Sequence, residues 1–84
     1  MPKKYVVTLT QEERDTLRQM LSAGEESARK LTRARILLKA DEGWTDKAIR
    51  QALYVHTSTV ERARRRFVEE GFEAAINRRP PRRN

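Results

Sequence analysis

Apolar residues recur along most of the chain at the spacing of α-helices. In the segment TQEERDTLRQMLSAG, residues 10–24, they lie three or four positions apart and define one helix face. These residues are Leu17, Met20 and Leu21. Thr10 followed by Glu13 three positions later is typical of a capping box, and Gly24 is typical of a helix end. The pattern therefore predicts a first helix between Thr10 and Gly24.

The segment SARKLTRARILLKADEG, residues 27–43, predicts a second helix that ends at Gly43. Its inward face is expected to consist of Ala28, Leu31, Ala34, Leu37 and Leu38. Its outer faces are expected to carry the basic residues Arg29, Lys30, Arg33 and Lys39. This division of apolar and basic positions is typical of a helix that packs on a core with one side and faces solvent with the other.

Two further helices are predicted, with only the short turn LYVH between them. TDKAIRQAL, residues 45–53, begins at the N-cap Thr45, and TSTVERARRRFVEEG, residues 57–71, ends at Gly71. His56 occupies the position of a cap before the second of them, and we expect a plain capping or turn role there. The inward-facing residues of this pair are expected to be Ile49, Leu53, Val55, Val60, Ala63 and Phe67.

The remaining segments complete an all-α fold of four to five short helices. FEAAIN, residues 72–77, predicts one more helical turn, and KKYVVTL near the start predicts a short extended segment that packs Val7 and Leu9 onto the helices. Trp44 is expected to be a core anchor. RRPPRRN, residues 78–84, cannot continue a helix because of its two prolines. We therefore expect one domain, residues 1–76, and a basic tail or linker start, residues 77–84.

Composition limits the function. The 84 residues carry a net charge of +7, which favours a polyanionic partner. The chain has no cysteine and one histidine, so we expect no disulfide, metal or other cofactor. No apolar run approaches the roughly 20 residues of a membrane span, and we expect a cytoplasmic protein. No Ser/His/Asp set or glycine-rich phosphate loop is present, so we expect no enzymatic activity.

The last two long helices have the pattern of a helix-turn-helix, whose second helix enters the major groove of DNA. With Val60 and Ala63 turned inward, the outer face of the second helix presents short hydroxyl residues followed by arginines. We predict base contacts from Thr57, Ser58, Thr59, Glu61, Arg62 and Arg65. Arg62 is the best candidate to donate two hydrogen bonds to one guanine. An amphipathic helix with merely solvated arginines is the alternative interpretation.

Phosphate contacts are predicted beside the base contacts. The candidates are Thr45, Lys47, Arg50 and Arg66. For Lys47 and Arg50 a purely solvated role is equally compatible with the sequence, and Thr45 is mainly a cap. The tail arginines are candidates for a minor groove or the backbone; they are Arg78, Arg79, Arg82 and Arg83.

Two segments, RKLTRARILLKADEGWTDKAIRQAL and STVERARRRFVEEGFEAAINRRP, carry a resemblance that extends over nearly the whole chain. The chain resembles the N-terminal DNA-binding region of bacterial insertion-sequence transposases of the mariner-related superfamily. The resemblance implies a homeodomain-like helical domain that binds the terminal inverted repeats of a mobile element. In such proteins a larger catalytic domain with three acidic metal ligands follows, and these 84 residues do not contain it. A bacterial, nucleoid-associated location is implied as well.

Two positions depart from that family, which usually has glycine in the turn and serine at the cap. This chain has Tyr54 and His56 there, so we expect a strained or altered turn. Three functions stay open: the DNA-binding part of a transposase, a stand-alone regulator of transcription or inhibitor of transposition, and a module that binds an acidic protein. A homodimer is also left open.

Overall fold

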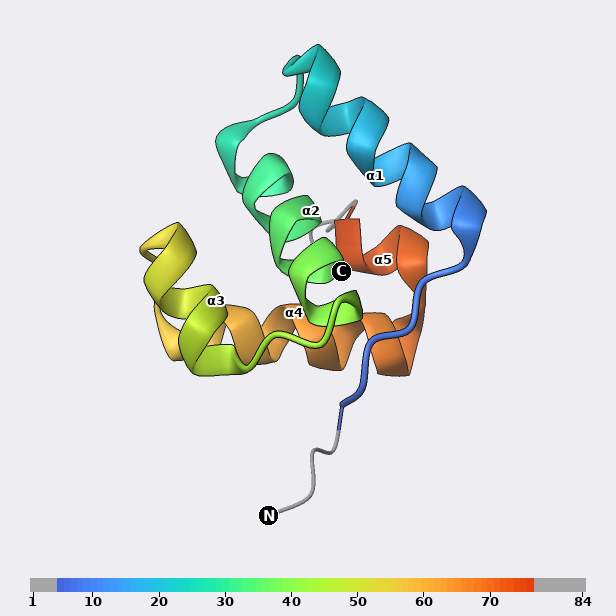
Figure 1. Ribbon diagram of the computed structural model, residues 1–84. Helices are drawn as coiled ribbons and strands as arrows, with labels where there is room; N and C mark the ends of the chain where they lie inside the picture. The colour runs from blue at the N-terminus through green and yellow to red at the C-terminus, as the bar shows by residue number, and fades with distance from the viewer. Residues whose placement is uncertain (1–4, 77–84) are drawn as a thin grey trace, which may run out of the picture.

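Five helices connected by short loops make up the described part of the computed structural model, residues 5–76 (Figure 1). They are α1 (Gln11–Ala23), α2 (Ala28–Asp41), α3 (Asp46–Leu53), α4 (Thr57–Glu70) and α5 (Phe72–Ile76). No strand occurs between residues 5 and 76. The predicted all-α helix-turn-helix cluster is therefore confirmed, with its helix ends within about two residues of the expected positions.

Capping side chains explain where three of the helices begin. The Thr10 hydroxyl accepts the Glu13 amide, and the Glu13 carboxylate accepts the Thr10 amide, which is the expected capping box. Ser27 accepts a hydrogen bond from the Lys30 amide at the start of α2, and Thr45 accepts one from the Ala48 amide at the start of α3. Gly24 ends α1 in the left-handed conformation, as expected.

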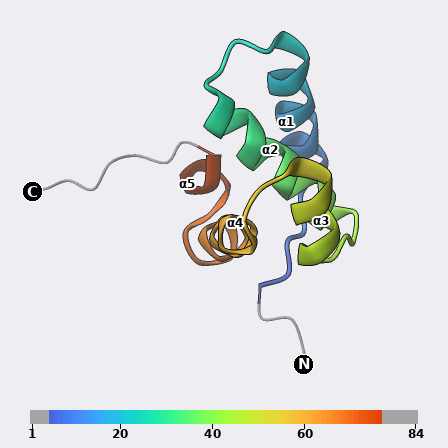
Figure 2. The same ribbon diagram turned by 90° about the vertical axis from the view of Figure 1, so that its left-hand side faces the viewer.

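α2 lies at the centre of the fold and packs against all four other helices (Figures 1 and 2). Because neighbours surround most of α2, its buried surface is wider than a single stripe. Ile36, outside the expected stripe, is fully buried, whereas Ala28, expected inside it, is exposed at the first turn. The buried apolar core consists of Val7, Leu9, Leu17, Ala34, Ile36, Leu37, Ala40, Ile49, Val60, Ala63, Ala75 and Ile76.

Two expectations for side chains near α2 were wrong. Trp44 is not a buried anchor, because 36% of it is exposed and its ring lies under the Lys39 ammonium, 4.1 Å from the ring centroid. Arg33 is not on a free outer face, since its guanidinium reaches across to α5. It donates to the carbonyls of Ala75 (3.1 Å) and Ile76 (3.0 Å). The short helix α5 is therefore tied to α2 by hydrogen bonds as well as by packing.

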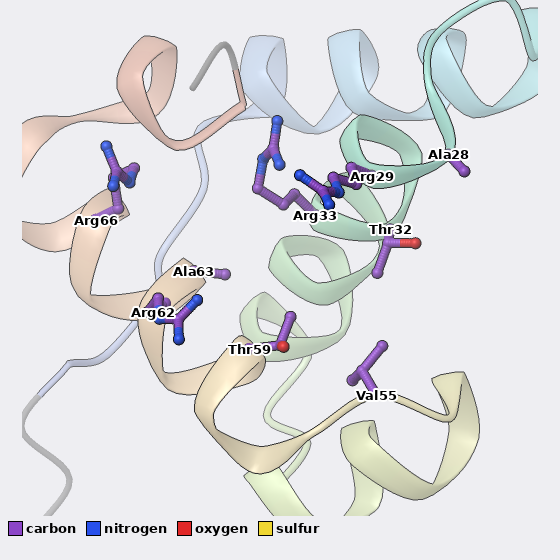
Figure 3. Close-up of a pocket in the computed structure, with 9 residues that line it drawn as sticks. All are labelled: Ala28, Arg29, Thr32, Arg33, Val55, Thr59, Arg62, Ala63 and Arg66. Carbon is purple, nitrogen blue, oxygen red and sulfur yellow. The ribbon is translucent and has the colours of Figure 1, made fainter. Parts of the chain in front are cut away.

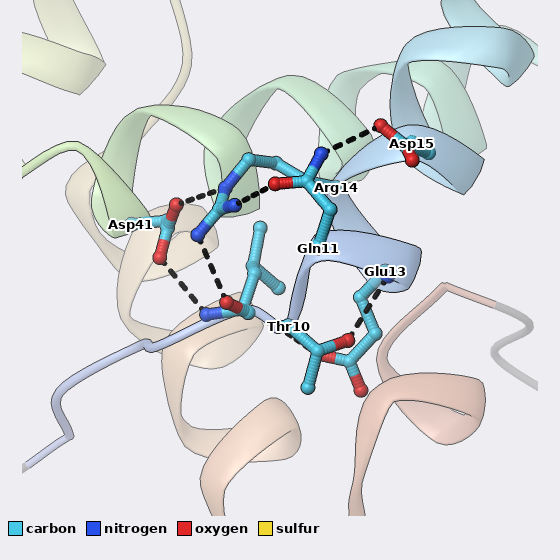
Figure 4. Close-up of polar contacts among 7 residues, drawn as sticks. Thr10, Gln11, Glu13, Arg14, Asp15 and Asp41 are labelled. Carbon is cyan, nitrogen blue, oxygen red and sulfur yellow. Dashed lines mark hydrogen bonds and ion pairs between the residues drawn. The ribbon is translucent and has the colours of Figure 1, made fainter.

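The segment before α1 is fastened to the helices by a cluster of polar contacts around Asp41 (Figure 4). One Asp41 oxygen accepts the Leu9 amide at 2.9 Å, and the other accepts Nε of Arg14 at 3.0 Å. Arg14 also donates to the Leu9 carbonyl. Burial raises the pKa of Asp41, but these hydrogen bonds and the Arg14 charge outweigh it and lower that pKa below its usual value. Val7 and Leu9 are thereby held in the core, as expected.

Candidate nucleic-acid interface

The turn between α3 and α4 contains a left-handed tyrosine. Tyr54 ends α3 with φ 57° and ψ 47°, and its amide donates to the Arg50 carbonyl. This conformation usually belongs to glycine, which matches the expectation of a strained turn. The Tyr54 side chain is 93% exposed. Val55, directly after it, turns inward and packs against the core, so the turn is fixed from one side.

α4 begins without help from a capping side chain. His56 occupies the N-cap position with an extended backbone, as expected, but its imidazole accepts no amide of the first turn. The first-turn amides of a helix point along its axis, out of its N-terminal end, and carry partial positive charge. The exposed hydroxyl residues Thr57 and Ser58 lie at this end. The start of α4 is therefore a polar surface with short side chains.

The two faces of α4 separate in the predicted manner. Val60 and Ala63 are buried, and Phe67 is partly buried against the core. Five of the residues predicted to contact bases are exposed together, namely Thr57, Ser58, Glu61, Arg62 and Arg65, whereas Thr59 is partly buried. Four of the exposed residues, Ser58, Glu61, Arg62 and Arg65, follow i, i+3, i+4, i+7 spacing, which places them on one side of the helix. A single polar and cationic edge therefore faces solvent.

Arg64 is the functional residue that sequence reasoning missed, because it is buried among three elements. Only 5% of it is exposed. Its guanidinium forms an ion pair with Asp46 at the start of α3 and donates to the Trp44 carbonyl at 2.8 Å. A longer contact, 3.4 Å, reaches the Tyr5 carbonyl. The signal was present, since Arg64 is one helical turn after buried Val60.

Two of the other arginines of α4 pair with exposed glutamates one turn further along. Nε of Arg65 lies 3.2 Å from Glu69, which raises the pKa of Arg65 further, and Arg66 lies 3.5 Å from Glu70. Such exposed pairs contribute little to stability and exchange readily with another anion. Arg62 makes no hydrogen bond or ion pair within residues 5–76. The positive charge of this edge is therefore available to a polyanion.

The residues predicted to contact phosphate have different surroundings. Thr45 uses its hydroxyl as the cap of α3, while Lys47 and Arg50 are exposed on the same short helix. Arg66 is partly buried beside α2. The predicted tail contacts Arg78, Arg79, Arg82 and Arg83 lie outside the described residues.

A groove separates α4 from the first two turns of α2 (Figure 3). Its volume is about 680 Å³. The lining residues are Ala28, Arg29, Thr32, Arg33, Val55, Thr59, Arg62, Ala63 and Arg66. Four of these nine residues are arginines, two from each helix, so the groove is strongly basic.

The packed α3–turn–α4 pair with a polar outer edge defines the class of the protein, a helix-turn-helix domain. The chain belongs to the homeodomain-like domain family, whose sequence model matches residues 27–76, more than half of the chain. Membership of this family indicates DNA binding. Comparisons with curated proteins and with solved structures gave no match. None of the helices between residues 5 and 76 is long and apolar enough to cross a membrane.

Proposed function

We propose that the chain binds double-stranded DNA in a sequence-specific manner, with the first half of α4 in the major groove. The observation that carries this proposal is the common orientation of Ser58, Arg62 and Arg65, which face solvent together while Val60 and Ala63 hold the opposite face in the core. The major groove admits an α-helix and displays a distinct pattern of donors and acceptors for each base pair. A fixed row of polar side chains suits that pattern.

Each position on the edge has a role that follows from its chemistry. Thr57 and Ser58 are short, so the start of α4 can approach the bases and the phosphates closely. Arg62 lies one turn further and can bind the two acceptors of a guanine, which is worth about 1–3 kcal/mol of discrimination. Glu61 can accept a hydrogen bond from the amino group of a cytosine. Thr59 is partly buried and lines the groove between α2 and α4, so it would contact DNA only from that side of α4.

Affinity is assigned to the basic residues around this edge. Lys47 and Arg50 on α3, together with Arg66 on α4, are proposed to contact phosphates and to set the orientation of the domain. Arg65 lies beside both the proposed base contacts and the proposed phosphate contacts. Such charge contacts release counterions from DNA, so binding is expected to weaken steeply as salt is added.

We further propose that the DNA targets are the terminal inverted repeats of an insertion sequence. The support is the resemblance of residues 29–53 and 58–80 to the DNA-binding region of mariner-related transposases, together with the helix-turn-helix itself. In this proposal the 84 residues bind DNA and perform no chemistry on it. The exposed, basic edge of α4 is compatible with that role.

Selection from a randomised duplex library with the full chain tests the proposal. We expect one motif to be enriched and to bind far more tightly than a scrambled duplex, with affinity falling as salt rises. Weak, salt-insensitive binding to both duplexes would contradict DNA binding. Mapping the enriched motif onto genomic DNA tests the finer proposal: paired, inverted copies at the ends of one element support it, and isolated copies before genes contradict it.

A further inference from the structure

The α2 side of the basic groove between α2 and α4 has no role in the function described so far. Figure 3 shows the arginines that line it from both helices, Arg29 and Arg33 from α2 and Arg62 and Arg66 from α4, with the Arg33 guanidinium turned toward α5. Thr32 and Thr59 add hydroxyl groups to its walls. The polar groups lining this groove are therefore mainly positively charged hydrogen-bond donors, a composition that selects an anion with several acceptor oxygens.

The charges in the groove are only partly compensated. Arg66 pairs with Glu70 at an exposed position, and Arg33 donates to two carbonyls of α5. Neither Arg29 nor Arg62 makes a hydrogen bond or ion pair within residues 5–76. The nearest acidic residue before α2, Glu26, is paired with Lys30 at 3.3 Å. Like charges held on facing walls repel each other, and an anion between them removes that repulsion.

The groove is continuous with the outer edge of α4. Arg62 belongs to both, since it faces solvent with the predicted base contacts and also lines the groove. A DNA duplex that receives α4 in its major groove has a sugar-phosphate strand on each side of that helix. The α2 side of α4 is the side on which the groove lies, so one of these strands would pass along it.

We propose that the α2–α4 groove is a binding site for the phosphate backbone of one DNA strand, with Arg29 as the contact from α2. This inference rests on the proposed function. It extends the DNA interface to α2, which sequence reasoning treated only as a packing helix with solvated arginines. Charge complementarity identifies the occupant: a duplex carries one negative charge per roughly 1.7 Å of its axis, and the groove offers guanidinium groups on both walls.

Two matched substitutions on α2 test the site. Arg29→Gln removes one charge inside the groove, and Arg35→Gln removes one charge from an exposed position of the same helix outside it. Both variants lower the net charge equally. Binding of the full chain to one fixed 20-base-pair duplex is measured between 50 and 200 mM salt, with fluorescence anisotropy as the readout.

Loss of one phosphate contact reduces the slope of log affinity against log salt by about 0.9, and weakens binding at 50 mM salt by about tenfold. We expect this change for Arg29→Gln and not for Arg35→Gln. If the unaltered chain does not bind the duplex, the proposed function itself fails. If the unaltered chain binds and the two variants have the same slope, only the groove proposal fails.

A third variant separates binding from folding. Ala28→Glu adds a negative charge at the groove entrance, while an acidic residue in the first turn stabilises a helix. We expect thermal unfolding at an equal or higher temperature together with weaker duplex binding. Unchanged duplex binding by Ala28→Glu would overturn the proposal, as would capture of an acidic peptide by the groove without competition from DNA.

Discussion

At the scale of single residues, the backbone at Tyr54 and the side chain of Arg62 matter most. Tyr54 is the one non-glycine residue with positive φ between residues 5 and 76. Its ring is exposed, so burial of the side chain contributes little to stability. Its conformation costs roughly 1–2 kcal/mol relative to a right-handed one. Arg62 has no partner within the described residues and is therefore free to bind a ligand.

Tyr54→Gly is expected to stabilise the domain by about 1 kcal/mol, because glycine adopts the left-handed conformation without a steric penalty. Urea denaturation followed by circular dichroism measures the change. Gln51→Gly, at an exposed position inside α3, is the matched control and should destabilise by roughly 0.5–1 kcal/mol. Equal destabilisation by both substitutions would show that the turn is not strained.

Arg62→Ala and Arg66→Ala are expected to affect DNA binding in different ways. Loss of Arg62 should reduce the preference for the selected duplex over a scrambled one by about 1–3 kcal/mol, because a base contact disappears. Loss of Arg66 should weaken both duplexes alike, because a phosphate contact carries no sequence information. Competition binding with the two duplexes measures both effects. The reverse result would mean that the orientation assigned to α4 is wrong.

At the scale of elements, two partly buried ion pairs connect helices that are separate in the sequence. Arg64 connects α4 to the start of α3 and to the carbonyl of Trp44, which fixes the angle between the two helices of the helix-turn-helix. Asp41 connects α2 to α1 through Arg14 and to the N-terminal segment through the Leu9 amide.

Asp46→Ala is expected to destabilise the fold by about 3 kcal/mol, because it leaves the buried Arg64 guanidinium without its counter-charge. The double variant Asp46→Ala/Arg64→Met should recover part of that loss, since it removes the unpaired charge and keeps the packing volume. Chemical denaturation of the single and double variants measures both values. Strictly additive losses would contradict a coupled pair.

The Asp41 pair predicts a dependence of stability on pH. The pKa of Asp41 is lower in the folded state than in the unfolded state, where it is near 3.8. The stability that its carboxylate contributes is therefore complete above the unfolded-state pKa and is lost as pH falls through the folded-state pKa. Asp41→Asn should therefore be less stable than the unaltered chain by about 2 kcal/mol at neutral pH. In denaturation curves, the difference in the free energy of unfolding between the variant and the unaltered chain should become smaller below about pH 4. Asp15→Asn, at an exposed position, should show no such narrowing, and a constant difference for Asp41→Asn would contradict the assignment.

At the scale of the whole molecule, the helices could be predicted from the sequence because apolar spacing and caps are local signals. Thr10 with Glu13 and the glycines at 24 and 71 marked helix ends, and the periodicity around Val60 oriented α4. Contacts between distant segments left no such signal. Ile36 is fully buried because several helices surround α2, and Arg29 lines the same groove as residues of α4 only because those two helices pack together.

The same difference explains the wrong expectations. Trp44 has the size and apolarity of a core residue, but its position just before α3 leaves the ring at the surface under Lys39. Arg33 has the charge of a surface residue, but α5 supplies carbonyl acceptors beside it. In both cases the tertiary environment, and not the residue type, decides burial.

The most direct test of the account is the location of DNA on the protein surface. Amide chemical shifts of the isotope-labelled full chain are recorded during titration with the selected duplex. The account predicts that the largest changes fall on residues 57–66 and on the first turns of α2 and α3, with α1 unaffected. Changes concentrated on α1, or an unperturbed α4 in a saturated complex, would contradict the central claim that the outer edge of α4 binds DNA.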